Sequence, residues 1–387
     1  ISEAQLTAAQ QAGLNPERVA ALLDRAGREV AEGLLPAAQL AIGRHGSVVL
    51  QQNYGDASDN SLFCIFSATK AITSAAIWLL LEADALRLDE RVADIIEPFG
   101  GNDKGAVTVE QLLTHTAGFP AAPFRPLDWP DLARRWQRFG QWRLSWPPGS
   151  RYEYHPTATM WVLAEIIERR GGIAFQQFIR EQIAEPLGLG DLYVGLPVAE
   201  NERVLPCAVV GEALTAEDYQ LLGMPEPPET EVTEDAILNF NNPEIRAVGV
   251  PGGGGITNAS TLARFYQALL TGGLDGVSVW KPETQQDART IRNGSFIDPL
   301  FGKPANRGLG LIISGDETRN YRGFGRTNSA TAFGHNGAGG QLAWVDPESG
   351  ISLCYLTSGH DRNSIRQARR GVAISSLAAL CAAPGSP

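Results

Sequence analysis

Residues 341–357 read QLAWVDPESGISLCYLT. Two apolar runs, Gln341–Val345 and Ile351–Thr357, flank the five residues DPESG at 346–350. Pro and Gly at such a position are typical of a tight turn. The stretch therefore predicts an antiparallel hairpin close to the C-terminal end of the chain.

A second hairpin is predicted near the other end. Ala38–Gly43 and Val48–Asn53 are short apolar runs separated by residues 44–47. Helical periodicity covers residues 3–33 and Ser364–Cys381, and it recurs between the hairpins, for example in Leu262–Leu270. Residues 119–150 are expected to form a loop, because Pro and Trp interrupt every period there.

These patterns predict an α+β fold. An antiparallel sheet formed by both chain ends would be flanked by the N- and C-terminal helices, with a mostly helical lobe inserted between the ends. We expect residues 1–80 and 246–387 to form the sheet lobe, residues 81–245 to form the helical lobe, and a site to lie at their interface.

Charge and composition exclude several classes of protein. The net charge of the 387 residues is −11, without the basic stripe of a nucleic-acid binder. No apolar run approaches the ~20 residues of a membrane span. Four Cys without a CxxC pair and five scattered His predict neither a disulfide framework nor a metal site, and no cofactor motif occurs. No signal peptide is visible. We expect a cytoplasmic protein, although the start at Ile1 is compatible with a removed leader.

The tetrapeptide Ser67-Ala68-Thr69-Lys70 opens a helical pattern. Residues i and i+3 share a helix face, so Lys70 can reach the Ser67 hydroxyl. A Ser nucleophile needs such a base, and burial can lower the pKa of a Lys enough for it to act as one. Chance alone supplies about 0.2 S-x-x-K motifs in this composition. A second copy, Ser278-Val279-Trp280-Lys281, precedes Pro282, which disfavours helix at Lys281.

Two further segments carry polar groups suited to the same chemistry. Pro148–Pro156 contains Tyr152 and Tyr154, and a Tyr beside a Lys can share the role of base. Gly334–Gly340 is rich in Gly, so its backbone can approach a ligand and donate N–H groups to an oxyanion. Taken alone, structural Tyr residues and a plain glycine turn explain both segments as well.

Together the motifs resemble the class C β-lactamase-like serine hydrolases, which are similar to penicillin-binding proteins. The chain order carries the resemblance: Ser67-x-x-Lys70, residues 112–118 (LLTHTAG), the Tyr154 segment, Gly252–Gly255 and His335-x-Gly337. It spans roughly residues 35–380 and implies a β-lactamase/transpeptidase-like fold. By the match, Ser67 would be the acylated nucleophile, Lys70 its base and Tyr154 the proton shuttle. The backbone N–H groups of Ser67 and Ala338 would form the oxyanion hole, and His335, Asn336 and Gly337 would contact substrate.

Two departures indicate the substrate. Pro156 stands where the family has Asn, and His335 stands where β-lactamases have Lys. Both changes remove polar handles for a β-lactam, and they resemble the pattern of family VIII carboxylesterases. The aromatic side chains of Phe119, Phe124, Trp129 and Trp146 are expected to form an apolar wall for substrate.

The resemblance and the departures predict a serine carboxylesterase that forms an acyl-enzyme on Ser67 and takes a small-molecule ester. Acyl transfer and β-lactamase or D-amino-acid peptidase activity are alternatives within enzymes. An acylated sensor and an inactive scaffold are the alternatives outside them. The sequence does not indicate the oligomeric state.

Overall fold

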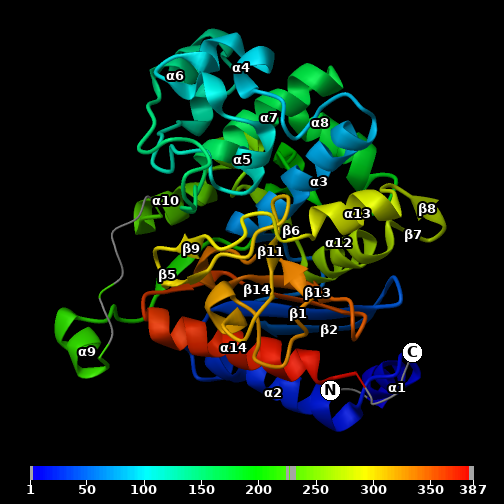
Figure 1. The fold of residues 1–387 in the computed structure, drawn as a ribbon. Coiled ribbons are helices and arrows are strands. Elements are labelled where there is room, and N and C mark those ends of the chain that lie inside the picture. Colours follow the sequence, from blue (N-terminus) through cyan, green and yellow to red (C-terminus); the bar gives the residue numbers. More distant parts are fainter. Residues whose placement is uncertain (1–2, 224–225, 227–231, 383–387) are drawn as a thin grey trace.

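The computed structural model describes residues 3–223, 226 and 232–382 (Figure 1). Its central sheet has six strands in the order β11-β12-β13-β14-β1-β2. β1 (Ala37–Arg44) and β2 (Ser47–Gly55) form one predicted hairpin, and β13 (Leu342–Asp346) and β14 (Ile351–Thr357) form the other. β1 pairs antiparallel with β14, so the two ends of the chain meet in the middle of the sheet. The predicted α+β class is confirmed.

Both faces of this sheet are covered, which explains why β1 and β14 are buried at every position. Leu40 and Leu353 pack with α2 (Pro16–Ala31) and α14 (Ser364–Ala379) below the sheet in Figure 1. Ala41 and Cys354, from the same strands, belong to the core that includes α12 (Ala259–Thr271). Neighbouring residues thus point to opposite faces, as the strand period requires.

Two short strands, β11 and β12, complete the central sheet, and the other elements lie outside it. The remaining helices are α1 (Glu3–Gln11), α3 (Thr69–Glu82), α4 (Val92–Ile95), α5 (Val109–Leu113), α6 (Leu132–Gln141), α7 (Ala158–Gly171), α8 (Phe175–Ile179), α9 (Ala216–Leu221), α10 (Glu234–Leu238), α11 (Pro243–Val248) and α13 (Pro282–Ala288). The remaining strands are β3 (Phe63–Cys64), β4 (Tyr193–Val194), β5 (Ala208–Val210), β6 (Gly255–Thr257), β7 (Gly273–Leu274), β8 (Val277–Ser278), β9 (Ile297–Asp298), β10 (Lys303–Pro304), β11 (Ile312–Ile313), β12 (Phe333–Gly334) and β15 (Gly359–Asp361).

α3 is the buried helix on which the site is built. It packs against α7, and its residues from Thr69 to Trp78 are all buried. Two indole N–H groups tie it to the segments around it: Trp280 donates to the Ala75 carbonyl of α3 at 3.0 Å, and Trp78 of α3 donates to the Leu309 carbonyl at 3.1 Å. A helix held in this way gives its first turn a fixed position.

The structure corrects the expected loop at residues 119–150. α6 lies within it and begins where the Asp131 carboxylate accepts the backbone N–H groups of Ala133 and Arg134. The helix is amphipathic and buries Arg135 and Phe139, but it is short and surrounded by Pro and Trp, which hid its period.

Among the described residues, no helix combines the length and the apolar character that a membrane crossing needs.

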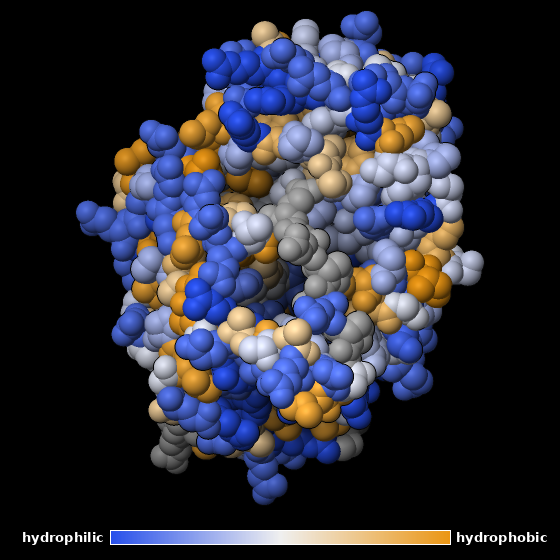
Figure 2. All heavy atoms as spheres, turned by 90° about the vertical axis from the view of Figure 1, so that its left-hand side faces the viewer, coloured by the Kyte–Doolittle hydropathy of each residue, from blue (hydrophilic) through white to orange (hydrophobic). Residues whose placement is uncertain are grey.

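The face on the left of Figure 1 is hollowed near its middle, as Figure 2 shows.

Candidate active site

Ser67 lies at a sharp turn between β3 and α3, within the short 3-10 helix Phe66–Ala68. Phe66, just before it, has a φ of 46°, a left-handed conformation that costs about 1–3 kcal/mol for a bulky residue. Its ring is held edge-on by Phe240 at 5.5 Å. The Thr69 hydroxyl donates to the Phe66 carbonyl at 2.5 Å and accepts from the Gly255 N–H at 2.8 Å. These contacts hold Ser67, half-buried, at the start of the helix.

Lys70 is completely buried, and its Nζ has three oxygen neighbours. Nζ donates to the carbonyl of Pro156 at 2.6 Å and to that of Gly252 at 2.8 Å, and it lies 3.2 Å from Ser67 Oγ. A neutral amine has two N–H groups and one lone pair. The carbonyls occupy both N–H groups, so the lone pair is left for the Ser67 hydroxyl. Burial, followed by the nearby Arg307 charge, lowers the pKa of Lys70 and favours this neutral form, against the raising effect of Tyr154.

Tyr154 is the third side chain of the cluster that contains Ser67 and Lys70. Its Oη donates to Ser67 Oγ at 2.9 Å, and Lys70 Nζ lies 5.0 Å from the centre of its ring. The structure therefore brings Ser67, Lys70 and Tyr154 together, although Tyr154 is 87 residues from the serine. His115 is buried, and its ring packs against the ring of Tyr154, with the ring centres 4.8 Å apart. This contact orients the Tyr154 side chain.

The Gly334–Gly340 segment reaches the same place from the sheet. An added Cβ on Gly337 would lie only 2.2 Å from the Ile65 carbonyl, so glycine is needed for this approach. The Gly337 N–H donates to the Gln341 carbonyl at 3.0 Å and closes a tight turn. Ala338, in this turn, packs on the cluster that contains Phe66. Its backbone is thus placed beside the segment of Ser67.

We expect Gly337→Ala to slow acylation by about 10²–10³-fold, the loss typical of one missing oxyanion donor. The new methyl group would push residues 337–338 away from the Ile65 carbonyl and from Ser67. The rate of organophosphonate labelling measures this directly. Gly190→Ala is the matched control, since an added Cβ there meets nothing within 4 Å. Equal labelling rates for the two variants would contradict the placement of Ala338 at the oxyanion.

The side chains of His335 and Asn336 are engaged within the protein. His335 Nδ1 lies 2.9 Å from the Asn336 carbonyl and must donate to it, so Nε2 accepts from Arg307 at 3.2 Å. Burial and the Arg307 charge hold the pKa of His335 well below its usual value. Asn336 donates to the Gly323 carbonyl and accepts from the Ala343 N–H. Both polar atoms of the Asn336 amide thus brace the turn, and a contact of Asn336 with substrate stays a prediction.

The expected aromatic wall is also corrected. Phe119 and Trp129 are 1% and 3% exposed and belong to the main core. Phe124 packs on Trp161 at 4.5 Å, within the same helical region. Trp146, 8% exposed, contacts the ring of His155, the residue after Tyr154. Most of these aromatic side chains stabilise the main core, and packing rather than substrate explains their clustering.

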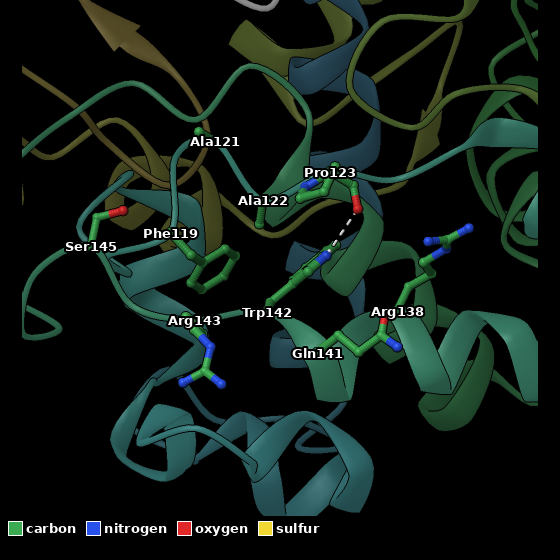
Figure 3. A pocket seen from close by; sticks show the side chains of 9 residues that line it. All are labelled: Phe119, Ala121, Ala122, Pro123, Arg138, Gln141, Trp142, Arg143 and Ser145. Atoms are coloured by element: carbon green, nitrogen blue, oxygen red, sulfur yellow. Dashed lines mark hydrogen bonds between the residues drawn. The ribbon is translucent and has the colours of Figure 1, made fainter.

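A cavity of about 280 Å³ does open beside Phe119, but away from the serine. Its lining contains none of Ser67, Lys70 and Tyr154. Figure 3 shows Phe119 and Trp142 side by side in it, with the Trp142 indole donating to the Pro123 carbonyl. Phe119 therefore faces a separate hollow of the helical region.

The second S-x-x-K motif is not built for catalysis. Ser278 is exposed in β8, and Lys281 is an extended residue before α13 whose ammonium lies 3.8 Å from Glu82. Within the described part of the chain, no group of three or more His, Cys, Asp or Glu side chains is arranged to hold a metal ion.

The chain is similar to known proteins in sequence and in fold. The model of the Beta-lactamase family matches residues 19–377. The chain is 25% identical over 320 residues to Esterase/beta-lactamase LipL of Mycobacterium tuberculosis (strain ATCC 25618 / H37Rv), covering 77% of this chain and 70% of that protein.

Solved structures show the same fold. A penicillin-binding protein homolog from Caulobacter crescentus is 29% identical, with a TM-score of 0.75 over 93% of this chain and 97% of the other. A family VIII carboxylesterase at 23% identity has a TM-score of 0.75 over 92% and 96% of the two chains. Because the family model spans nearly the whole sequence, the chain belongs to the Beta-lactamase family.

Proposed function

We propose that this protein is a serine hydrolase that cleaves carboxylic esters through an acyl-enzyme on Ser67. The observation that carries the proposal is the environment of Lys70, whose two carbonyl acceptors leave one lone pair for the Ser67 hydroxyl. The name of the relative LipL, which includes both esterase and β-lactamase, supports this class of reaction.

In the proposed acylation, Lys70 takes the proton of Ser67 while Oγ attacks the ester carbonyl. Negative charge develops on the carbonyl oxygen, and the N–H groups of Ser67 and Ala338 would stabilise it. The N-terminus of α3 adds a partial positive charge beside Ser67.

The proposed leaving step uses Tyr154. Its hydroxyl, 2.9 Å from Ser67 Oγ, is placed to pass a proton to the departing alcohol, and Lys70 replenishes it. Water then attacks the acyl-enzyme with the same pair acting as base. The proposed machinery joins the proposed lobes: Ser67 and Lys70 come from residues 1–80, Tyr154 from 81–245 and Ala338 from 246–387.

Neutral esters fit the site better than β-lactams. The Pro156 carbonyl accepts a hydrogen bond from Lys70. Pro156 also lacks the side-chain amide with which an Asn at this position would bind the side chain of a β-lactam. The neutral, buried His335 offers no ammonium to a carboxylate. A hydrogen bond to a charged group contributes roughly 1.5–3 kcal/mol, so one missing partner costs about ten- to a hundred-fold in discrimination.

We therefore expect short and medium p-nitrophenyl esters to exceed nitrocefin and benzylpenicillin in kcat/KM by at least about ten-fold. Parallel steady-state assays with esters, both β-lactams and a D-alanine amide test this. A burst of product followed by continued release would show turnover rather than a single acylation. A β-lactam cleaved as well as the best ester would overturn the preference for esters and leave the acyl-enzyme mechanism standing.

A further inference from the structure

Arg307 is a buried cation beside the proposed catalytic group, and no motif pointed to it. Its side chain is 6% exposed. Nε donates to Tyr152 Oη at 3.0 Å, and Nη1 donates to His335 Nε2 at 3.2 Å. The guanidinium lies 5.2 Å from the centre of the Tyr154 ring. One side chain thus contacts both the Tyr segment and the Gly334–Gly340 segment.

No carboxylate forms an ion pair with this charge, although Asp298 is near enough to interact with it electrostatically. Within residues 3–223, 226 and 232–382, no ion pair includes Arg307. Its two partners are uncharged: burial raises the pKa of the Tyr152 phenol and lowers that of His335. A buried charge without a counter-ion is costly, so its place beside Ser67, Lys70 and Tyr154 calls for a functional reason.

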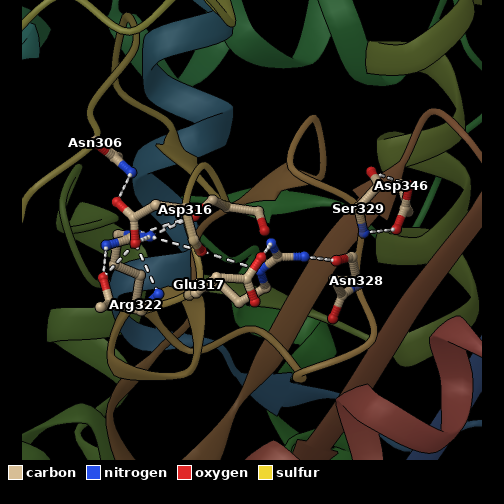
Figure 4. Close-up of polar contacts among 10 residues, drawn as sticks. Asn306, Asp316, Glu317, Arg322, Asn328, Ser329 and Asp346 are labelled. Carbon is tan, nitrogen blue, oxygen red and sulfur yellow. Dashed lines mark hydrogen bonds and ion pairs between the residues drawn. The ribbon is translucent and has the colours of Figure 1, made fainter.

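Polar contacts hold the residues that precede Arg307. Asn306 has a φ of 45°, and its amide donates to Asp316 at 3.3 Å. Arg322 donates to the Pro304 carbonyl at 2.8 Å and pairs with Asp316 at 3.0 Å. Figure 4 shows the contacts among Asn306, Asp316 and Arg322. These contacts hold the backbone just before Arg307 in place.

The charge of Arg307 acts on the groups around the serine. After burial, it is a cause of the lowered pKa of Lys70, of His115 and of His335. The titratable and charged groups that face Lys70 and Arg307 are Tyr152, Tyr154, His115, His335, Asp298 and Arg322. Asp298 is itself mostly buried, and burial raises its pKa. Arg307 in turn lowers the pKa of Asp298, so the two side chains interact although they form no ion pair.

We propose that Arg307 is a positioning residue, which holds Tyr154 and His335 around Ser67 and supplies the positive charge that the His335-Asn336-Gly337 segment lacks. It acts through these two side chains and not by binding the substrate. The inference rests on the proposed acyl-enzyme function. It adds a residue to that function which neither spacing nor motif indicates.

Two variants test the role. Arg307→Met removes the charge and keeps the length, and we expect kcat for a neutral p-nitrophenyl ester to fall about 10²-fold with little change in KM, as for a reacting group misplaced by about 1 Å. Without the cation, the pKa of Lys70 rises, so the acid limb of the pH–rate profile moves to higher pH. Arg307→Lys keeps the charge but not the planar fork, so the limb should stay near its wild-type position while kcat falls less.

Arg135→Met is the matched control, because Arg135 is an equally buried Arg, in α6, that pairs with Glu165 at 2.6 Å. It should lower the melting temperature without moving the acid limb. The inference is overturned if Arg307→Met leaves both kcat and the acid limb unchanged. It is also overturned if the variant raises KM for anionic esters alone, since Arg307 would then be a substrate contact.

Organophosphonate labelling separates the two levels of proposal. If wild-type protein is not labelled at Ser67, the proposed function fails, whatever Arg307 does. If wild-type protein is labelled and Arg307→Met reacts at the same rate over the whole pH range, the function stands and only the inference fails.

Discussion

Ser67→Ala is expected to lower kcat/KM for an ester substrate by about 10⁶-fold, the loss seen when a serine hydrolase loses its nucleophile. The methyl group cannot attack a carbonyl, and it has no acidic proton that Lys70 could take. Hydrolysis of a p-nitrophenyl ester gives the rate. Mass spectrometry after organophosphonate treatment gives the stoichiometry, which should be one label per wild-type chain and none in the variant.

Ser278→Ala is the control, because Ser278 opens the other S-x-x-K motif. It is exposed in β8, and the ammonium of Lys281 lies 3.8 Å from Glu82. Its replacement should change neither rate nor labelling. A Ser67→Ala protein with an unchanged rate, or a label found on any other serine, would contradict the acyl-enzyme mechanism as a whole.

Local patterns predicted the parts of the fold that local forces decide. The hairpins at residues 37–55 and 342–357 follow from apolar runs around turn residues. The helix α14 follows from the helical period at Ser364–Cys381. α6 was missed because ten residues with scattered Trp and Arg give a weak period.

The candidate site was predictable as far as its motifs reach. Ser67 and Lys70 are one helical turn apart, so their contact is a local property. Arg307 was missed because its contact with Tyr152 joins residues 155 positions apart, and an isolated Arg carries no signal of burial. The aromatic residues at 119–146 show the opposite error, since composition cannot tell a substrate wall from the core of a lobe.

Backbone strain was equally invisible in the sequence. Phe66 adopts a left-handed φ, which the residue type Phe does not predict. The surrounding fold holds it there through Phe240 and Thr69. Strain of this kind depends on tertiary contacts and marks a place where the chain must turn within one residue.

Lys70→Arg and Lys70→Met are both expected to lower the acylation rate by about 10⁴-fold, the upper range for a general base. Arg stays protonated at every working pH and has no lone pair for the Ser67 proton. Met has neither a charge nor a basic nitrogen. The pair of variants distinguishes a base from a cation, because a Lys70 that served only as a positive charge would be replaced well by Arg and poorly by Met.

The pH profile tests the same point in the wild-type protein. The neutral amine of Lys70 is the active form, so the rate should fall on the acid side as the amine takes up a proton. Burial lowers the pKa of Lys70, so the midpoint of this fall should lie below the usual range of lysine. A flat rate from about pH 5 to 9 would count against Lys70 as the base.

Lys104 provides a matched control for both experiments. It is also fully buried, and its Nζ donates to two carbonyls, those of Gly101 and Trp142, each at 2.5 Å. Burial lowers the pKa of Lys104 to about 8. Among the described residues, its Nζ has no hydrogen bond with a side-chain hydroxyl. Lys104→Met should therefore lower the melting temperature as Lys70→Met does, but leave the acylation rate and its pH profile intact. If both Met variants lost activity in proportion to their stability, Lys70 would be a structural lysine, and another group would have to take the proton of Ser67.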